Sequence, residues 1–308
     1  MAFTAADVKA LREKTGVGMM DCKKALVEAD GDMEKAIDVL REKGLAASTK
    51  KAGRIAAEGV VLTYTDEDKN ISVMVEVNSE TDFVAKNEKF TDYVKAVAKT
   101  IADTNPADVD TLLTTTLDGS DRTVQENLQD LVLSIGENMK IRRFERVESV
   151  ASSYIHAGGA VGVLVLFDTD AETAKTDAFK AMGKDVAMQV AAMSPSYLDP
   201  ASVPAEVLDH EKEIMTAQLA EDPKMQGKPQ QVLAKIVEGK IGKYYKENCL
   251  LEQAFVKDDK MNVQKYIDSV AKELGAEIKA TSFIRYAKGE GLEKKEEDFA
   301  AEIASMLK

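Results

Sequence analysis

The chain has 308 residues, of which 44% are hydrophobic, and its 54 acidic and 41 basic residues give a net charge of −13. This length and composition fit two or three domains with packed cores and argue against global disorder. The acidic excess argues against general binding to nucleic acid or to an anionic membrane, because phosphate groups would repel it. A protein partner is therefore expected.

The cysteines and the N-terminal segment indicate a location in the cytoplasm. Cys22 and Cys249 are far apart and form no paired motif, which is typical of free thiols in a reducing compartment. The first residues carry charges from Asp7 onward and contain no apolar signal-peptide segment. No run of about 18 apolar residues is present, so no membrane span is expected.

The first 55 residues are predicted to form three short helices and a linker. Thr4 and Asp7 make a capping box for the first helix, and residues 19–29 form the second. Asp32 caps the third helix, and Gly44 is expected to end it as a C′ glycine. A unit this small has a thin core. It is therefore either a stabilising appendage or a docking module.

Residues 43–57 contain basic residues and no acid, which predicts a solvated linker rather than a binding patch. Because this linker is polar, deleting residues 1–50 is expected to leave the rest of the chain folded.

Residues 56–286 contain an internal repeat. At an offset of 89, residues 73–77 fall on 162–166 and the helix marked by Phe90 falls on that marked by Phe179. At an offset of 139, residues 124–146 fall on 263–285, so the second copy holds an insertion of about 50 residues. Each copy is predicted to contain strands with helices against one face, which indicates an α+β fold with antiparallel sheets.

Apolar residues at helical spacing predict a helical hairpin in the insertion, at about residues 204–248. It packs on its own core, or it serves as an interaction arm or dimer contact. Gly239 and Gly242 in its second helix each cost about 1 kcal/mol relative to Ala.

The predicted division is therefore a helical domain (1–55), a first core subdomain (56–148), a second core subdomain with the hairpin (149–286) and a C-terminal module (287–308). In the last part, Leu292 to Lys308 is predicted to form a charged amphipathic helix with Phe299, Ile303 and Met306 on one face.

No enzyme signature is found in the sequence. There is no glycine-rich phosphate loop, and the glycines of residues 158–162 precede a strand rather than follow one. His156 and His210 lie in no metal-ligand or nucleophile motif. We therefore expect no catalytic residue, metal or cofactor, and no direct binding of nucleotides. An enzyme that uses a pair of carboxylates stays open as an alternative.

The corner after the strand of residues 73–77 carries Thr81, Asp82, Phe83 and Val84. Phe83 is either a hydrophobic staple that holds the turn or a contact residue. In the second copy, Asp82 falls on Ala171 and Phe83 on Glu172, so the fold does not require the aromatic ring. This difference favours a contact residue. His156 falls on Glu67 in the loop between two strands, which favours an exposed position.

Five segments, in this order, resemble the bacterial elongation factor Ts family: TGVGMMDCKKAL, SETDFVAKNEKF, IGENMKIRRFERV, GKPQQVLAKIVEGK and FIRYAKGEGLEKKEEDFAAEI. The resemblance covers nearly the whole chain. It implies a ubiquitin-associated-like three-helix N-terminal domain, a core of two related α+β subdomains, an inserted coiled-coil hairpin and a C-terminal helix.

The resemblance also implies a function, which is to bind elongation factor Tu and to release its GDP by disturbing its magnesium and phosphate site. The residues that it assigns to the magnesium-site disruption are Thr81, Asp82, Phe83 and Val84. The other partner contacts that it implies are Arg12, Met19, Met20, Ile135, Gly136 and His156. The hairpin is a candidate dimer contact. A scaffold or chaperone-like binding protein of the translation machinery, without exchange activity, is the alternative.

Overall fold

The computed structural model describes residues 3–293. The described chain forms two compact units, one of residues 3–147, 157–162 and 286–293 and the other of residues 148–156 and 163–285. The predicted C-terminal helix, Leu292 to Lys308, lies outside the described residues from position 294 onward. Within residues 3–293, no helix combines the length and the apolar character that a membrane crossing requires.

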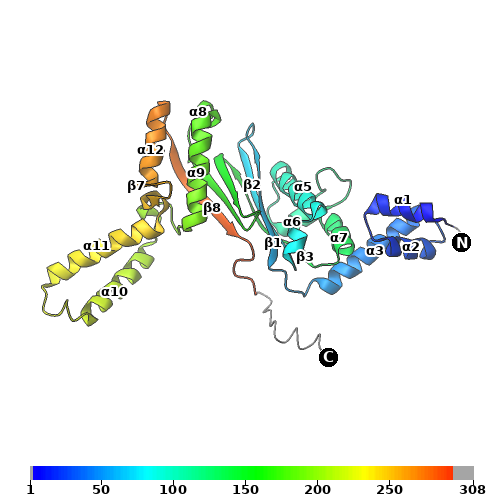
Figure 1. The fold of residues 1–308 in the computed structure, drawn as a ribbon, viewed down its shortest axis with the longest axis horizontal. Helices are drawn as coiled ribbons and strands as arrows, with labels where there is room; N and C mark the ends of the chain where they lie inside the picture. Colours follow the sequence, from blue (N-terminus) through cyan, green and yellow to red (C-terminus); the bar gives the residue numbers. More distant parts are fainter. Residues whose placement is uncertain (1–2, 294–308) are drawn as a thin grey trace. The chain divides into compact units, whose positions relative to one another are not determined.

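The first unit begins with three helices, α1 (Ala5–Thr15), α2 (Met19–Glu28) and α3 (Met33–Lys51) (Figure 1). The capping box of Thr4 and Asp7 and the Asp32 cap of α3 are both present, as predicted. Apolar side chains from each helix, including Leu11, Leu26 and Leu40, form a small core of their own.

Helix α3 continues through Gly44 to Lys51, so the prediction that Gly44 ends the helix was wrong. The reason is tertiary packing, because Gly44 faces α7 (Val124–Ile135), where an added Cβ would lie 3.4 Å from the Gln129 carbonyl oxygen. Leu133 of α7 packs against the core of the three helices. Much of the predicted linker is therefore helix, and the N-terminal helices pack on the rest of the unit.

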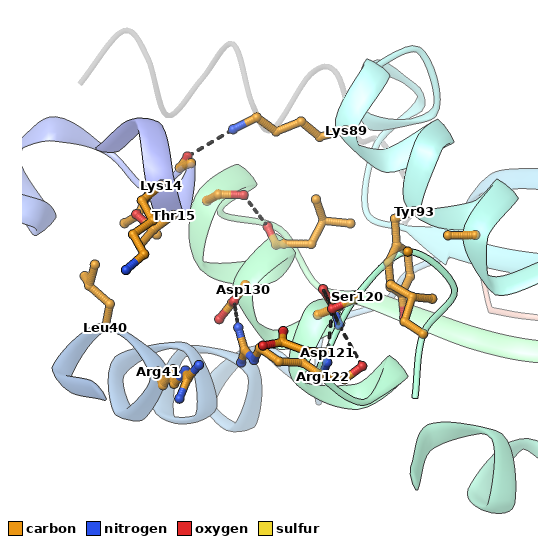
Figure 2. Close-up of a pocket in the computed structure, with 18 of the residues that line it drawn as sticks. Lys14, Thr15, Leu40, Arg41, Lys89, Tyr93, Ser120, Asp121, Arg122 and Asp130 are labelled. Carbon is orange, nitrogen blue, oxygen red and sulfur yellow. Dashed lines mark hydrogen bonds and ion pairs between the residues drawn. The ribbon is translucent and has the colours of Figure 1, made fainter. Parts of the chain in front are cut away.

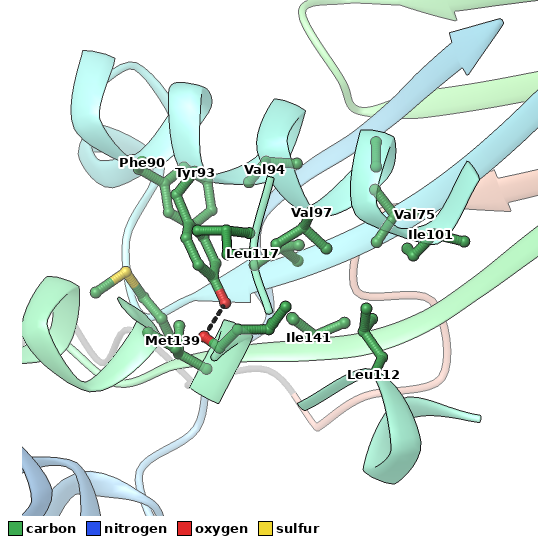
Figure 3. Packing of buried hydrophobic residues seen from close by; sticks show 14 of the residues in the cluster. Val75, Phe90, Tyr93, Val94, Val97, Ile101, Leu112, Leu117, Met139 and Ile141 are labelled. Carbon is green, nitrogen blue, oxygen red and sulfur yellow. Dashed lines mark hydrogen bonds between the residues drawn. The ribbon is translucent and has the colours of Figure 1, made fainter. Parts of the chain in front are cut away.

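The first unit also contains a sheet with the order β1 (Glu58–Asp66), β2 (Ile71–Ser79) and β3 (Met139–Glu148). Helices α5 (Glu88–Thr104), α6 (Val109–Thr114) and α7 enclose a hydrophobic core with this sheet (Figure 3). The Tyr93 hydroxyl donates to the Val124 carbonyl oxygen at 3.1 Å, and burial raises the pKa of this phenol.

Every residue of β2 is buried, although its sequence alternates. Val73, Val75 and Val77 belong to the core beneath α5, whereas Glu76 is on the opposite face and is fully buried. Its carboxylate accepts hydrogen bonds from Arg142, Arg143, Asn78 and the backbone N–H of Gly289. Burial alone would raise the pKa of Glu76, but these hydrogen bonds outweigh it and lower the pKa below its ordinary value.

The second unit contains the sheet β4 (Val150–His156), β5 (Val161–Asp168) and β8 (Lys279–Ala287), in that order. Its helices include α8 (Ala171–Lys175), α9 (Asp177–Met193) and α12 (Val263–Leu274). The offset of 89 carries both ends of α5 onto the ends of α9, and the offset of 139 does the same for α7 and α12. These boundaries confirm the predicted repeat and the α+β fold.

The insertion contains the two predicted hairpin helices, α10 (Ala205–Glu221) and α11 (Gln230–Asn248). Short elements flank them, namely η1 (Pro200–Ser202), η2 (Leu250–Glu252), β6 (Ala254–Phe255) and β7 (Asp258–Asn262). Helix α11 passes unbroken through Gly239 and Gly242, each of which faces open space.

The buried Glu76 predicts a pH-dependent stability that one substitution removes. Its folded pKa lies below the ordinary value of 4.5, so its contribution is complete above that pH and is lost as the pH falls through the folded pKa. Glu76→Gln should lower the free energy of unfolding by about 3 kcal/mol at pH 7, because Arg142 and Arg143 lose their counter-charge. Urea unfolding at pH 7 and at pH 3 measures both values. An equal difference between the two proteins at both pH values would contradict the prediction.

The packing of α3 on α7 changes the expected result of an N-terminal truncation. Deleting residues 1–50 uncovers the face of α7 around Gln129 and Leu133, so it should lower the melting temperature of the remaining chain by several degrees. Thermal unfolding of the truncated and full chains tests this expectation. An unchanged melting temperature would show that the N-terminal helices are energetically separate.

Candidate partner-binding site

The predicted corner is a single helical turn, α4 (Asp82–Ala85), which begins three residues after the end of β2. Phe83 is 78% exposed and belongs to no hydrophobic cluster of the described residues. Asp82 is also exposed, and its carboxylate accepts a hydrogen bond from Lys86 at 3.2 Å. A ring this exposed cannot staple the turn, so the staple hypothesis for Phe83 is wrong.

Val84 differs from its neighbours because it is only 4% exposed. Its side chain belongs to the same core as Phe90 and Tyr93. Although Val84 is one of the predicted partner contacts, in this structure it fastens the corner to the core.

Thr81 is held from outside the corner by Glu137. The Thr81 backbone N–H donates to Oε2 of Glu137 at 2.9 Å, and its hydroxyl donates to Oε1 at 2.7 Å. Glu137 directly follows Ile135 and Gly136, the last residue and the left-handed cap of α7. The structure therefore joins two predicted groups of residues that are more than 50 positions apart in the sequence.

A second set of hydrogen bonds joins the residues next to Thr81 and Glu137. The Asn138 backbone N–H donates to the Glu80 carboxylate at 2.6 Å, and the Asn138 side-chain amide donates to the Arg54 carbonyl oxygen at 2.8 Å. Arg54 in turn donates to Glu80 at 3.4 Å. We refer to Arg54, Glu80, Thr81, Glu137 and Asn138 together as the corner clamp.

Sequence reasoning missed four of these five residues and identified only Thr81. Glu80 and Glu137 lie beside predicted residues, within segments already recognised as family motifs. Their neutral counterparts in the second copy, Thr169 and Ala276, could have marked both acids as special to the first copy.

The predicted contacts in the N-terminal helices also lie on the surface. Met19 and Met20 at the start of α2 are 46% and 62% exposed, and Arg12 of α1 is exposed as well. Val27 adds a further exposed apolar side chain to α2. Neighbouring exposed apolar residues of this kind are typical of a protein-binding surface.

An open cleft of about 760 Å³ lies between the N-terminal helices and the core of the same unit (Figure 2). Its wall carries both signs of charge, with Lys14, Arg41 and Arg122 beside Asp121 and Asp130. The mixed signs give it no preference for a phosphate group. None of the ten predicted site residues lines it. Lys89 spans it and donates to the Gly16 carbonyl oxygen at 3.0 Å. We therefore interpret the cleft as the place where the N-terminal helices pack against the rest of the unit, and not as a ligand site.

His156 belongs to the second unit, where it is exposed at the end of β4. Its Nδ1 lies 3.1 Å from the Tyr154 hydroxyl oxygen. The hairpin of the same unit has an apolar groove of about 670 Å³, lined by Leu219, Leu233 and Val237 among others. Dimerisation through the hairpin stays a prediction.

The sequence of the chain matches known proteins over its full length. The sequence model of a family described as elongation factor TS matches residues 80–290, a range that includes the corner. The elongation factor Ts of Clostridium perfringens is 52% identical over 307 residues, and that of Clostridium kluyveri is 51% identical over 309; each alignment covers 99% of both chains. That of Nitratiruptor is 49% identical over 312 residues, which cover both chains completely.

The chain belongs to the elongation factor Ts family. Membership confirms the predicted resemblance and makes the chain a translation elongation factor. The structure adds a geometric description of the family segment SETDFV in this chain, in which Phe83 and Asp82 are exposed while Val84 is buried. Among residues 3–293, no group of three or more His, Cys, Asp or Glu side chains is arranged to hold a metal ion.

The different burial of two adjacent residues can be tested by stability measurements. Val84→Ala removes buried methyl groups and should cost about 2 kcal/mol of unfolding free energy. Phe83→Ala changes an exposed side chain and should stay within about 0.5 kcal/mol of the parent. Chemical denaturation measures both. A larger loss for Phe83→Ala than for Val84→Ala would show that the ring is buried in solution.

Proposed function

We propose that this chain binds elongation factor Tu and accelerates the release of GDP from it, with the corner of Asp82 and Phe83 as the element that disturbs the nucleotide site. The observation that carries this proposal is an aromatic ring exposed to solvent, beside a carboxylate, on a turn that Glu137 holds at its start and buried Val84 attaches to the core. Family membership supports it, since the family takes part in translation elongation.

The mechanism requires binding energy and no covalent chemistry. A factor that binds the nucleotide-free form of its partner more tightly must weaken nucleotide binding by the same ratio. Tight binding of GDP is expressed mainly in a slow dissociation rate, so the factor acts by raising that rate. It therefore needs no catalytic residue and no nucleotide site of its own.

The two exposed residues of the corner have different proposed roles. The ring of Phe83 enters the GTPase domain and occupies space that elements of the magnesium and phosphate site otherwise fill. The carboxylate of Asp82 competes for groups that hold the water ligands of the cation. The second copy supports this assignment, because its equivalent turn places exposed Glu172 where the first copy has Phe83.

The remaining predicted residues have the proposed role of supplying affinity. Arg12, Met19 and Met20 form one group on the N-terminal helices, and Ile135 with Gly136 lies beside Glu137 of the corner clamp. His156 is a proposed contact of the second unit. The proposed activity places the chain in the cytoplasm with the translation machinery.

Phe83→Ala and Asp82→Ala should slow the release of GDP more than they weaken the complex. At saturating concentrations of the factor, we expect roughly tenfold or slower release for Phe83→Ala and a smaller effect for Asp82→Ala, because the ring supplies the bulk. The measurement is stopped-flow release of fluorescent GDP from elongation factor Tu, with affinity determined separately by titration. Glu172→Ala, at the equivalent position of the second copy, is the matched control.

Three results would count against the proposal. If the parent chain binds elongation factor Tu without accelerating release, it is a scaffold. If Phe83→Ala releases GDP at the parent rate, the corner is not the disturbing element. Equal effects of Phe83→Ala and Glu172→Ala would show that neither turn has a special role.

A further inference from the structure

We propose that Glu137 is a positioning residue that sets the direction of Phe83 by holding the Thr81 hydroxyl away from the start of α4. This inference rests on the proposed function, because it concerns the element that enters the nucleotide site. It assigns a role to a residue that lies 54 positions beyond Phe83 and does not itself take part in the corner turn.

The first argument comes from other threonines at the same helical position. Thr4, Thr123 and Thr176 each precede a helix, and each hydroxyl accepts a hydrogen bond from the third N–H of that helix. Thr81 also precedes a helix and has extended backbone angles, but α4 has no side-chain cap. Its hydroxyl donates to Glu137 instead.

The second argument comes from the equivalent turn of the second copy. There Asp170 takes the place of Thr81 and caps α8, accepting from the N–H groups of Glu172 and Thr173. One tie of the strand end has an equivalent there: the hydroxyl of Thr169, the counterpart of Glu80, donates at 2.8 Å to the carbonyl oxygen of Glu277, the counterpart of Asn138. The tie between Glu80 and Asn138 is thus repeated in the second copy, whereas the bonds from Thr81 to Glu137 and the uncapped turn belong to the copy that carries Phe83.

These facts define two arrangements of the Thr81 side chain. In the structure, two charge-assisted hydrogen bonds hold Thr81 on Glu137. Without the carboxylate, the hydroxyl is free to turn and to accept from the N–H of Val84, as the other threonines do. Because α4 is a single turn, loss of the Glu137 bonds to the Thr81 N–H and hydroxyl lets the backbone of residues 81–83 shift and redirects Phe83, while buried Val84 keeps the turn attached to the core.

The backbone on both sides of Glu137 is itself held in place. The next residue, Asn138, is held through its backbone by Glu80 and through its side chain by the Arg54 carbonyl oxygen. The preceding residue, Gly136, ends α7 in a left-handed conformation. The carboxylate is therefore a rigid reference for the corner.

The test uses substitutions that keep or remove the two bonds. Glu137→Ala removes both, whereas Glu137→Gln keeps both, because the amide oxygen accepts from the Thr81 N–H and the amide nitrogen donates to the hydroxyl. Thr81→Val removes the hydroxyl bond from the other side, and Thr81→Ser keeps it. Thr169→Val removes the bond that ties the end of β5 to Glu277 in the second copy and is the control for loosening the corresponding strand end there.

We expect release of GDP at saturating concentrations of the factor to be roughly tenfold slower for Glu137→Ala, the order of effect that the loss of a hydrogen bond to a charged group produces. Glu137→Gln and Thr81→Ser should release GDP at nearly the parent rate. The double variant of Glu137→Ala and Thr81→Val should be no slower than the slower single variant, because both remove one interaction. Thr169→Val should have no effect.

Fluorine NMR of full chains that carry 4-fluorophenylalanine reports the direction of the ring without the partner. The chain has nine phenylalanines, and the signal of Phe83 is the one missing from Phe83→Ala. That signal should shift in Glu137→Ala and Thr81→Val and stay in place in Glu137→Gln and Thr169→Val. An unmoved signal in Glu137→Ala would overturn the inference.

The two assays also separate this inference from the proposed function. If Phe83→Ala slows release but Glu137→Ala and Thr81→Val do not, the positioning role is wrong and the proposed function stands. If Phe83→Ala leaves release unchanged, the proposed function is wrong and the role of Glu137 in exchange is overturned with it. In that case the NMR signal would still show whether Glu137 directs the ring.

Discussion

Phe83 stays exposed because the backbone around it is held in place and cannot move to cover the ring. Burying a phenylalanine side chain is worth about 1.5–3 kcal/mol, so an exposed ring favours any rearrangement that covers it. The structure opposes such a rearrangement on one side through Thr81 and Glu137 and on the other through Val84, which is packed in the core. The rest of the first unit supplies the fixed ends of these contacts, since β2 and α7 are both parts of the core.

The duplicated core offers an internal comparison that separates folding from function. Positions that fill the core keep large apolar side chains in both copies, as Phe90 and Phe179 show. The position of Phe83 carries a glutamate in the other copy, while the turn and the following helix keep their place in the sequence. Because one scaffold tolerates both side chains, the ring is explained by something outside the scaffold.

Local and repeated patterns were sufficient to predict the three N-terminal helices, the Thr4 and Asp32 caps, the long helices and strands of the two copies and the inserted hairpin. They were insufficient wherever a distant segment determines the outcome. The extension of α3 through Gly44 depends on α7, and the burial of Glu76 depends on a residue more than 200 positions away. The corner clamp is of the same kind, since periodicity within one segment does not show which acid a threonine will bind. The exposed ring was predictable because the two copies differ there; the same comparison marks Glu80 and Glu137 as special to the first copy but does not show which groups they bind.

Typical binding free energies indicate how affinity is divided between the corner and the other surfaces in the proposed function. A dissociation constant in the nanomolar to micromolar range requires about 8–12 kcal/mol, several times what one phenylalanine side chain can contribute. In the proposed function, the corner therefore cannot be the main source of affinity, and other surfaces, such as the exposed methionines of α2, would have to supply most of it. This division would suit the proposed exchange activity. Binding energy gained away from the nucleotide would hold the partner, while a small rigid element that adds little affinity could be expelled when a new nucleotide binds. A loosely held ring would lose this advantage, because ordering it on contact would cost conformational entropy at the step where it must displace its neighbours.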